Sequence, residues 1–133
     1  MTGEKSPAPI VLVVDDEPLI RWSLTEGLTE GGYVVRQAAT GAEARTVLGA
    51  TLGEPMVVLL DLRLPDVTDL SLLREIRERM PKTPVIVITA HGTPEDKREA
   101  RKLGVFRVVD KPFDVTEVVN LVAEASFFQA PSS

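Results

Sequence analysis

Short apolar runs rich in β-branched residues recur along the chain, and longer amphipathic segments separate them. The runs cover residues 10–14, 33–35, 56–60, 85–88 and 105–109. Because they lack the alternation of apolar and polar residues seen on a solvated sheet face, they are typical of strands buried on both faces of a parallel sheet. Each interval is long enough for a crossover helix. The pattern predicts an α/β fold with a doubly wound, five-stranded parallel sheet.

The segments between the runs carry signals for helix starts. Each signal places a proline, or a capping side chain with an acid three residues later, where a helix would begin. These are Pro18, Thr40 with Glu43, Thr93 with Pro94, and Asp114 with Glu117. The fourth segment, residues 95–103, differs from the other segments, because it offers only Ala100 and Leu103 to a core. We therefore expect the fourth helix to be weakly held.

Length and charge narrow the class of protein. With 133 residues the chain fits one domain, which we place at 9–128, with tails at 1–8 and 129–133 whose composition is typical of disordered ends or a linker remnant. The net charge of -5 disfavours direct binding of nucleic acid, and neither a membrane span nor a secretory signal is apparent. The chain has no cysteine, which excludes disulfides and thiolate metal sites. We expect a cytoplasmic protein.

Polar residues follow four of the predicted strands at the point where each strand ends. Asp15 and Asp16 follow the first strand, Asp61 the third, Thr89 the fourth and Lys111 the fifth. In an open parallel sheet the ligand site lies beyond the carboxyl ends of the strands, so these side chains should converge. A pair of carboxylates directly after a buried strand is costly unless a cation relieves the repulsion.

Each of these residues also has a plain structural interpretation. The acidic run could be a solvated surface, Asp61 a turn residue, Thr89 an ordinary strand residue and Lys111 a surface amine. As a set they provide oxygen ligands for Mg²⁺, a carboxylate nucleophile, and a hydroxyl with an ammonium to hold phosphoryl oxygens. The set predicts a phosphoryl-transfer site. We interpret His91, the single histidine, as a solvent-facing loop residue rather than a general base.

At these positions the chain resembles the receiver domain of two-component response regulators. The resemblance covers about residues 9–128 and rests on Val13-Val14-Asp15-Asp16-Glu17, Asp61-Leu62-Arg63-Leu64-Pro65, Thr89-Ala90-His91 and Lys111-Pro112-Phe113. It implies a flavodoxin-like sheet with strand order 2-1-3-4-5, the order that a receiver of this family illustrates. It also implies that Asp61 is the phospho-acceptor. Mg²⁺ would then be held by Asp15, Asp16, Asp61 and the Arg63 carbonyl, and the phosphoryl group by Thr89 and Lys111.

The same resemblance implies a signalling switch rather than a turnover enzyme, with only self-catalysed phosphotransfer and slow autodephosphorylation. Its partners would be a sensor histidine kinase and an output domain or downstream protein, and homodimerisation is left open. The surface of the fourth helix, fifth strand and fifth helix would carry the response. The runs Ile20-Arg21-Trp22 and Lys111-Pro112-Phe113-Asp114 look most like receivers of sigma-54-dependent transcription activators.

Two departures from the family pattern leave alternatives open. Val108 occupies the place of the usual switching aromatic residue, and we expect Phe106, on the same side of the strand, to pack in the core. The loop 65–69 lacks the glycine usual in the family. The main alternative is a receiver-like interaction module that works without phosphate. A small aspartate-nucleophile phosphatase would need an acid where Arg63 stands, and a redox flavoprotein would need a glycine-rich phosphate loop.

Overall fold

The computed structural model describes residues 9–90 and 92–129, which form a five-stranded parallel sheet. The strands are β1 (Ile10–Val14), β2 (Val34–Ala38), β3 (Met56–Asp61), β4 (Val85–Thr89) and β5 (Arg107–Asp110). They lie in the order β2-β1-β3-β4-β5, and every neighbouring pair is parallel. The doubly wound fold and the strand order predicted from the sequence are both confirmed.

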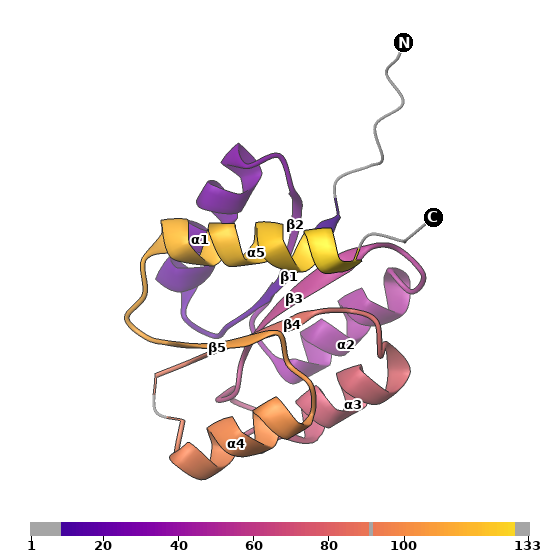
Figure 1. Ribbon diagram of the computed structural model, residues 1–133, viewed down its shortest axis with the longest axis vertical. Helices are drawn as coiled ribbons and strands as arrows, with labels where there is room; N and C mark the ends of the chain where they lie inside the picture. Colours follow the sequence, from indigo (N-terminus) through magenta and orange to yellow (C-terminus); the bar gives the residue numbers. More distant parts are fainter. Residues whose placement is uncertain (1–8, 91, 130–133) are drawn as a thin grey trace.

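Helices cover both faces of this sheet. The helices are α1 (Pro18–Glu30), α2 (Gly41–Ala50), α3 (Ser71–Arg79), α4 (Pro94–Lys102) and α5 (Val115–Gln129). Figure 1 shows α1 and α5 on one face and α2, α3 and α4 on the other. This three-layer arrangement leaves the carboxyl ends of the strands at one edge of the domain.

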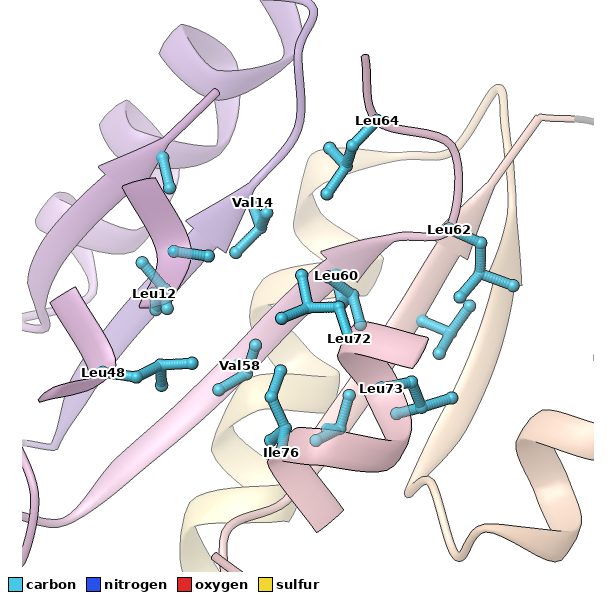
Figure 2. Packing of buried hydrophobic residues seen from close by; sticks show 14 of the residues in the cluster. Leu12, Val14, Leu48, Val58, Leu60, Leu62, Leu64, Leu72, Leu73 and Ile76 are labelled. Atoms are coloured by element: carbon cyan, nitrogen blue, oxygen red, sulfur yellow. The ribbon is translucent and has the colours of Figure 1, made fainter. Parts of the chain in front are cut away.

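Alternate residues of the central strands feed two separate apolar clusters. Leu12 and Val14 of β1 point to the α2–α4 face, whereas Val11 and Val13 point to the α1–α5 face. Figure 2 shows the first cluster, in which β1 and β3 side chains pack against α2 and α3. Each fully buried aliphatic side chain contributes roughly 1.5–3 kcal/mol, so these two layers hold the sheet edge in place.

Both edge strands differ from the sequence prediction. The run 33–35 predicts the second strand, but β2 extends over Val34–Ala38 and includes the polar residues Arg36 and Gln37. It is largely exposed, because a strand at the edge of the sheet has only one neighbour. β5 begins at Arg107, two residues later than predicted, and is also partly exposed. Burial on both faces holds for β1, β3 and β4 alone.

The predicted helix starts are found, with differences in the capping bonds. The hydroxyls of Thr40 and Thr93 accept hydrogen bonds from the amides three residues later, at 3.1 and 3.0 Å. Asp114 instead accepts from the Thr116 amide, at 2.9 Å. In α4 the one fully buried residue is Ala100, as expected for a weakly held helix.

The chain ends are described only in part. The predicted tails at 1–8 and 130–133 lie outside the described residues, whereas Gln129, which the sequence assigned to a tail, belongs to α5. Within 9–90 and 92–129, no helix is long and apolar enough to cross a membrane.

Candidate functional site

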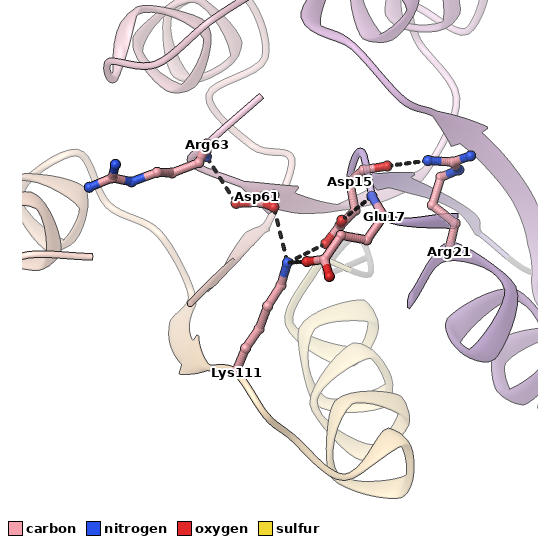
Figure 3. A network of polar contacts seen from close by, with 6 residues as sticks. All are labelled: Asp15, Glu17, Arg21, Asp61, Arg63 and Lys111. Atoms are coloured by element: carbon pink, nitrogen blue, oxygen red, sulfur yellow. Dashed lines mark hydrogen bonds and ion pairs between the residues drawn. The ribbon is translucent and has the colours of Figure 1, made fainter. Parts of the chain in front are cut away.

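The site forms where β1, β3 and β5 end, and Lys111 lies at its centre (Figure 3). Its Nζ lies 2.9 Å from Asp15 Oδ2, 2.8 Å from Glu17 Oε1 and 3.1 Å from Asp61 Oδ2. The peptide bond between Lys111 and Pro112 is cis. Asp15, Asp61 and Lys111, which the sequence predicted to converge, therefore meet in one polar network. Glu17 was not predicted as a site residue, although it belongs to the same acidic triplet.

Asp61 is held in a defined orientation inside this network. It is 5% exposed, and its Oδ1 accepts a hydrogen bond from the Arg63 amide at 2.9 Å. Burial raises the pKa of the Asp61 carboxyl; the Arg63 amide and the Lys111 ammonium oppose this shift without cancelling it. The contacts with Arg63 and Lys111 therefore compensate only part of the cost of burying the ionised Asp61 carboxylate. A nearby cation would stabilise this carboxylate further.

The ammonium of Lys111 is in the opposite situation. Burial by itself lowers the pKa of Lys111, but its hydrogen bonds to Asp15, Glu17 and Asp61 outweigh burial and hold the pKa above its ordinary range. Lys111 is therefore charged at every pH near neutrality. It contributes stability below its ordinary pKa of about 10.4, and this contribution is lost as the pH rises beyond that value.

The carboxylates of the site fit a divalent cation. One oxygen each from Asp15, Asp16, Glu17 and Asp61 lies within 4.8 Å of the others, a spacing that a small ion with oxygen ligands at about 2.1 Å can bridge. Asp15 is buried and Asp16 is exposed, so the cluster is open to water on one side. Oxygen ligands beside solvent are the environment that Mg²⁺ prefers. The role predicted for the Arg63 carbonyl stays a prediction.

Thr89 ends β4 next to this network. Its side chain is fully buried, and its Oγ1 has no hydrogen-bond partner among residues 9–90 and 92–129. Its carbonyl accepts from the Lys111 amide at 2.9 Å, which ties it to the lysine backbone. A Cβ on Gly92 would lie 2.9 Å from Thr89 Cγ2, so the glycine lets the loop close over this residue. His91 lies outside the described residues, and its predicted role is not tested.

The loop after Asp61 takes a defined path without the family's usual glycine. The backbones of Leu64 and Val67 exchange hydrogen bonds at 3.0 and 3.3 Å, which forms a tight turn. Asp66 then accepts from the Gly41 and Ala42 amides at 2.8 and 3.0 Å, at the start of α2. A Cβ on Gly41 would lie 2.5 Å from Val67 Cγ2, so this glycine allows the close approach. Sequence reasoning missed this cap, because the two segments are distant in the chain.

Val108 and Phe106 lie on different faces of the sheet, contrary to the prediction. Phe106 precedes β5 and packs against the α1–α5 cluster, with the Arg107 guanidinium 4.6 Å from its ring centre. Val108 packs against the cluster on the α2–α4 face. The alternation rule fails here because residue 106 lies outside the regular strand. Phe106 therefore does not replace the missing aromatic residue beside α4.

Fold and site together define a doubly wound α/β protein with a lysine and carboxylates at the carboxyl edge of its sheet. The family model of the response regulator receiver domain matches residues 11–123. The chain belongs to this family, and it is a receiver domain of NtrC type.

Relatives and solved structures agree with this assignment. The DNA-binding transcriptional regulator NtrC of Escherichia coli strain K12 is 40% identical over 116 residues, which cover 87% of this chain and 24% of that protein. The response regulator protein PilR of Pseudomonas aeruginosa is 39% identical over 123 residues, covering 92% of this chain and 27% of PilR. This chain thus spans about a quarter of the length of these relatives.

The solved structures are similar over nearly the whole domain. The solution structure of the beryllofluoride-activated NtrC4 receiver domain dimer has a TM-score of 0.82 and 34% identity, and the match covers 91% of this chain and 98% of that one. The receiver domain of NtrX from Brucella abortus has a TM-score of 0.77 and 32% identity, covering 90% of this chain and 99% of that one.

Proposed function

We propose that this receiver domain accepts a phosphoryl group on Asp61 from a sensor histidine kinase in a reaction that requires Mg²⁺. The observation that carries the proposal is the position of Lys111 Nζ, 3.1 Å from Asp61 Oδ2, beside carboxylates suited to a divalent cation. The ammonium and the cation would offset the charge of the incoming phosphoryl group. The beryllofluoride-activated state of the NtrC4 receiver supports a similar chemistry here.

The reaction forms an acyl phosphate. An Asp61 oxygen attacks phosphorus, a P–O bond forms, and the P–N bond to the kinase imidazole breaks, so that the imidazole leaves. Mg²⁺, when bound by Asp15, Asp16, Asp61 and the Arg63 carbonyl, supplies charge neutralisation at the phosphoryl oxygens. Lys111 and the Thr89 hydroxyl would hold two further oxygens. Each receiver molecule would change state once per phosphoryl group and would return to the unphosphorylated state by slow hydrolysis of the acyl phosphate, as a switch does.

Intact-mass measurement after incubation with acetyl phosphate and Mg²⁺ tests the phosphoryl acceptor. We expect the parent chain to gain the mass of one phosphoryl group, and Asp61→Asn to gain none, because the amide is a poor nucleophile. Asp66→Asn is the matched control, since this nearby acid is engaged with α2 and should leave the adduct intact. No adduct on the parent chain, or an adduct that persists in Asp61→Asn, would contradict the assignment.

The readout of the switch would lie on the surface of α4, β5 and α5, which faces an output domain or partner. α4 buries only Ala100, and its first turn is tied to β5 by an ion pair between Lys97 Nζ and Asp110 Oδ1 at 2.6 Å. A second exposed ion pair joins Glu99 of α4 to Arg74 of α3 at 3.9 Å. Few apolar contacts and ion pairs that are partly exposed make a helix that can shift at small cost. The position of Thr89 between Asp61 and the loop leading to α4 makes it the residue that would transmit the change.

Thr89→Val should impair transmission of the signal from Asp61 to α4 with little change in the stability of the fold. The hydroxyl is buried and unpartnered within the described residues, so its replacement by a methyl group should change the free energy of unfolding by less than about 1 kcal/mol. We expect beryllofluoride to alter amide hydrogen exchange across residues 92–102 in the parent chain, and to alter it much less in Thr89→Val. Equal changes in both proteins would remove Thr89 from the switch.

A second candidate function is a receiver-like interaction module that works without phosphate. Val108, which packs toward the α2–α4 face in place of an aromatic residue, favours it. The two functions differ in one result, since the module would show the same α4 exchange with and without beryllofluoride. We rank phosphoryl acceptance first because the acidic cluster and the lysine are both in place. The homodimer seen for the NtrC4 receiver is a further proposal for this chain.

A further inference from the structure

All three N–H groups of Lys111 are engaged in this state of the domain. An ammonium group has three donors, and Lys111 Nζ has carboxylate oxygens of Asp15, Glu17 and Asp61 at 2.9, 2.8 and 3.1 Å. A phosphoryl oxygen arriving at Lys111 therefore has to displace one of these three contacts. The identity of the displaced residue decides how much phosphoryl binding costs.

Asp15 and Asp61 are poor candidates for displacement. Asp61 itself would carry the phosphoryl group. Asp15 is 2% exposed, and its Oδ1 accepts from the Glu17 amide at 2.8 Å, while its carbonyl accepts from the Arg21 guanidinium at 2.6 Å. Breaking a contact of this buried carboxylate would leave a desolvated charge without compensation.

Glu17 differs from both in its exposure. Its side chain is 56% exposed, so water can solvate the carboxylate as soon as it leaves Lys111. Its contact with Lys111 is nevertheless as short as the buried contact with Asp15. Glu17 is therefore the one of the three carboxylates that can be displaced at low cost.

The position of Glu17 at the start of α1 gives independent support. Glu17 is the N-cap residue of α1, yet its side chain makes no capping hydrogen bond, and the first turn of α1 contains no acidic residue. The positive end of the helix dipole favours an acid at this place. The Glu17 carboxylate nevertheless contacts Lys111 and not its own helix. Once released from Lys111, it could interact with the free amides of the first turn of α1.

We infer that Glu17 is a positioning residue that competes with the phosphoryl group for Lys111. In the resting state it holds the N–H that a phosphoryl oxygen needs, and it swings into solvent when that oxygen arrives. Glu17 thereby sets the affinity of the site for the phosphoryl group. This inference rests on the proposed phosphoryl acceptance at Asp61.

Beryllofluoride titration at saturating Mg²⁺ tests the inference, with parent, Glu17→Asp, Glu17→Gln and Glu26→Gln compared. Glu17→Asp keeps the negative charge but is one methylene shorter, so it should lose the contact with Lys111. We expect its beryllofluoride affinity to rise about 2- to 5-fold, the range of an exposed ion pair. Glu17→Gln should rise at least as much. Glu26→Gln removes a charge from the exposed side of the same helix and should change the affinity less.

The ammonium signal of Lys111 in ¹H–¹⁵N spectra gives a second readout, which would not change if the role of Glu17 were merely structural. In resting Glu17→Asp we expect faster exchange of the Lys111 ammonium protons with water than in the parent, because one N–H is released. Binding of beryllofluoride should then bring the parent and the variant to similar spectra, since Glu17 has left Lys111 in both.

Several outcomes would overturn the inference. Equal affinities in all four proteins would eliminate competition by Glu17 while leaving phosphoryl acceptance intact. A rise in Glu17→Gln with none in Glu17→Asp would assign the effect to net charge. Much weaker Mg²⁺ binding in both Glu17 variants, measured separately, would make Glu17 a metal ligand. Binding in none of the four proteins would instead defeat the proposed function.

Discussion

Lys111→Met should lower the free energy of unfolding by about 2–3 kcal/mol near pH 7 in the absence of divalent ions. Methionine keeps an unbranched apolar stem but removes the charge, which leaves Asp15 and Asp61 buried without a cation. If Lys111 were the plain surface amine that the sequence also allows, its loss would leave the fold intact. The contacts change that expectation, because the Lys111 side chain is only 8% exposed. Urea unfolding of parent and variant measures the difference.

The pH dependence of this loss identifies its cause. Burial raises the pKa of Asp61 even beside Lys111, and removing the ammonium should raise that pKa further. A carboxyl whose pKa is raised by folding binds more protons in the native state, so stability increases as the pH falls through that range. The deficit of Lys111→Met should therefore shrink as the pH falls from neutrality toward the ordinary carboxyl pKa of about 3.9.

A double-mutant cycle with Asp61→Asn provides the control. The amide at residue 61 needs no counter-charge, so Lys111→Met should cost about 1 kcal/mol less in the Asp61→Asn background than in the parent. An equal loss in both backgrounds would mean that Lys111 stabilises the fold through packing of its stem. A loss below about 0.5 kcal/mol in the parent would mean that water already compensates the acids.

Asp16→Ala should weaken Mg²⁺ binding at least about 10-fold. Asp16 is exposed and, among residues 9–90 and 92–129, no ion pair or hydrogen bond of its side chain supports the fold, so the variant should fold normally. Its carboxylate belongs to the cluster within 4.8 Å and supplies one of few protein oxygens, the rest of the Mg²⁺ shell being water. Calorimetric titration with MgCl₂ measures the affinity directly.

Two further observations make the Mg²⁺ test specific. Trp22 on α1 is 62% exposed, so its fluorescence offers an independent titration signal. Glu78→Gln, a charge change on the exposed side of α3, should leave the affinity within about 2-fold of the parent, because solvent and salt screen distant charges. If Asp16→Ala and Glu78→Gln had the same effect, the acidic cluster would be a solvated surface without a specific metal site.

The fold was predictable from the sequence where burial is complete. β1, β3 and β4 are continuous apolar runs and were located correctly to within one residue at each end. β2 was misplaced because Arg36 and Gln37 look like loop residues, although an edge strand tolerates them. The position of a strand in the sheet decides which residues it can contain, and that position is not visible in a local window.

The candidate site was predictable as far as topology alone defines it. The rule that ligands lie beyond the carboxyl ends of parallel strands brought Asp15, Asp61 and Lys111 together correctly. It could not show that Glu17 binds Lys111, or that Asp66 caps α2, since both contacts depend on side-chain directions and loop paths. A different rule, the alternation of side chains along a strand, wrongly placed Phe106 and Val108 on one side of a strand that residue 106 does not enter.

The interior position of β1, between β2 and β3, determines how the polypeptide can fold. β1 pairs with β2 on one side and with β3 on the other, so Ile10 is aligned with both Val34 and Met56. Both pairings are parallel and distant in sequence, which predicts slower folding than in helical bundles of similar size. Until β4 forms, β3 has an unpaired edge rich in apolar residues, and such edges promote aggregation. Partly folded chains in which β3 has formed but β4 has not should therefore depend most on chaperones.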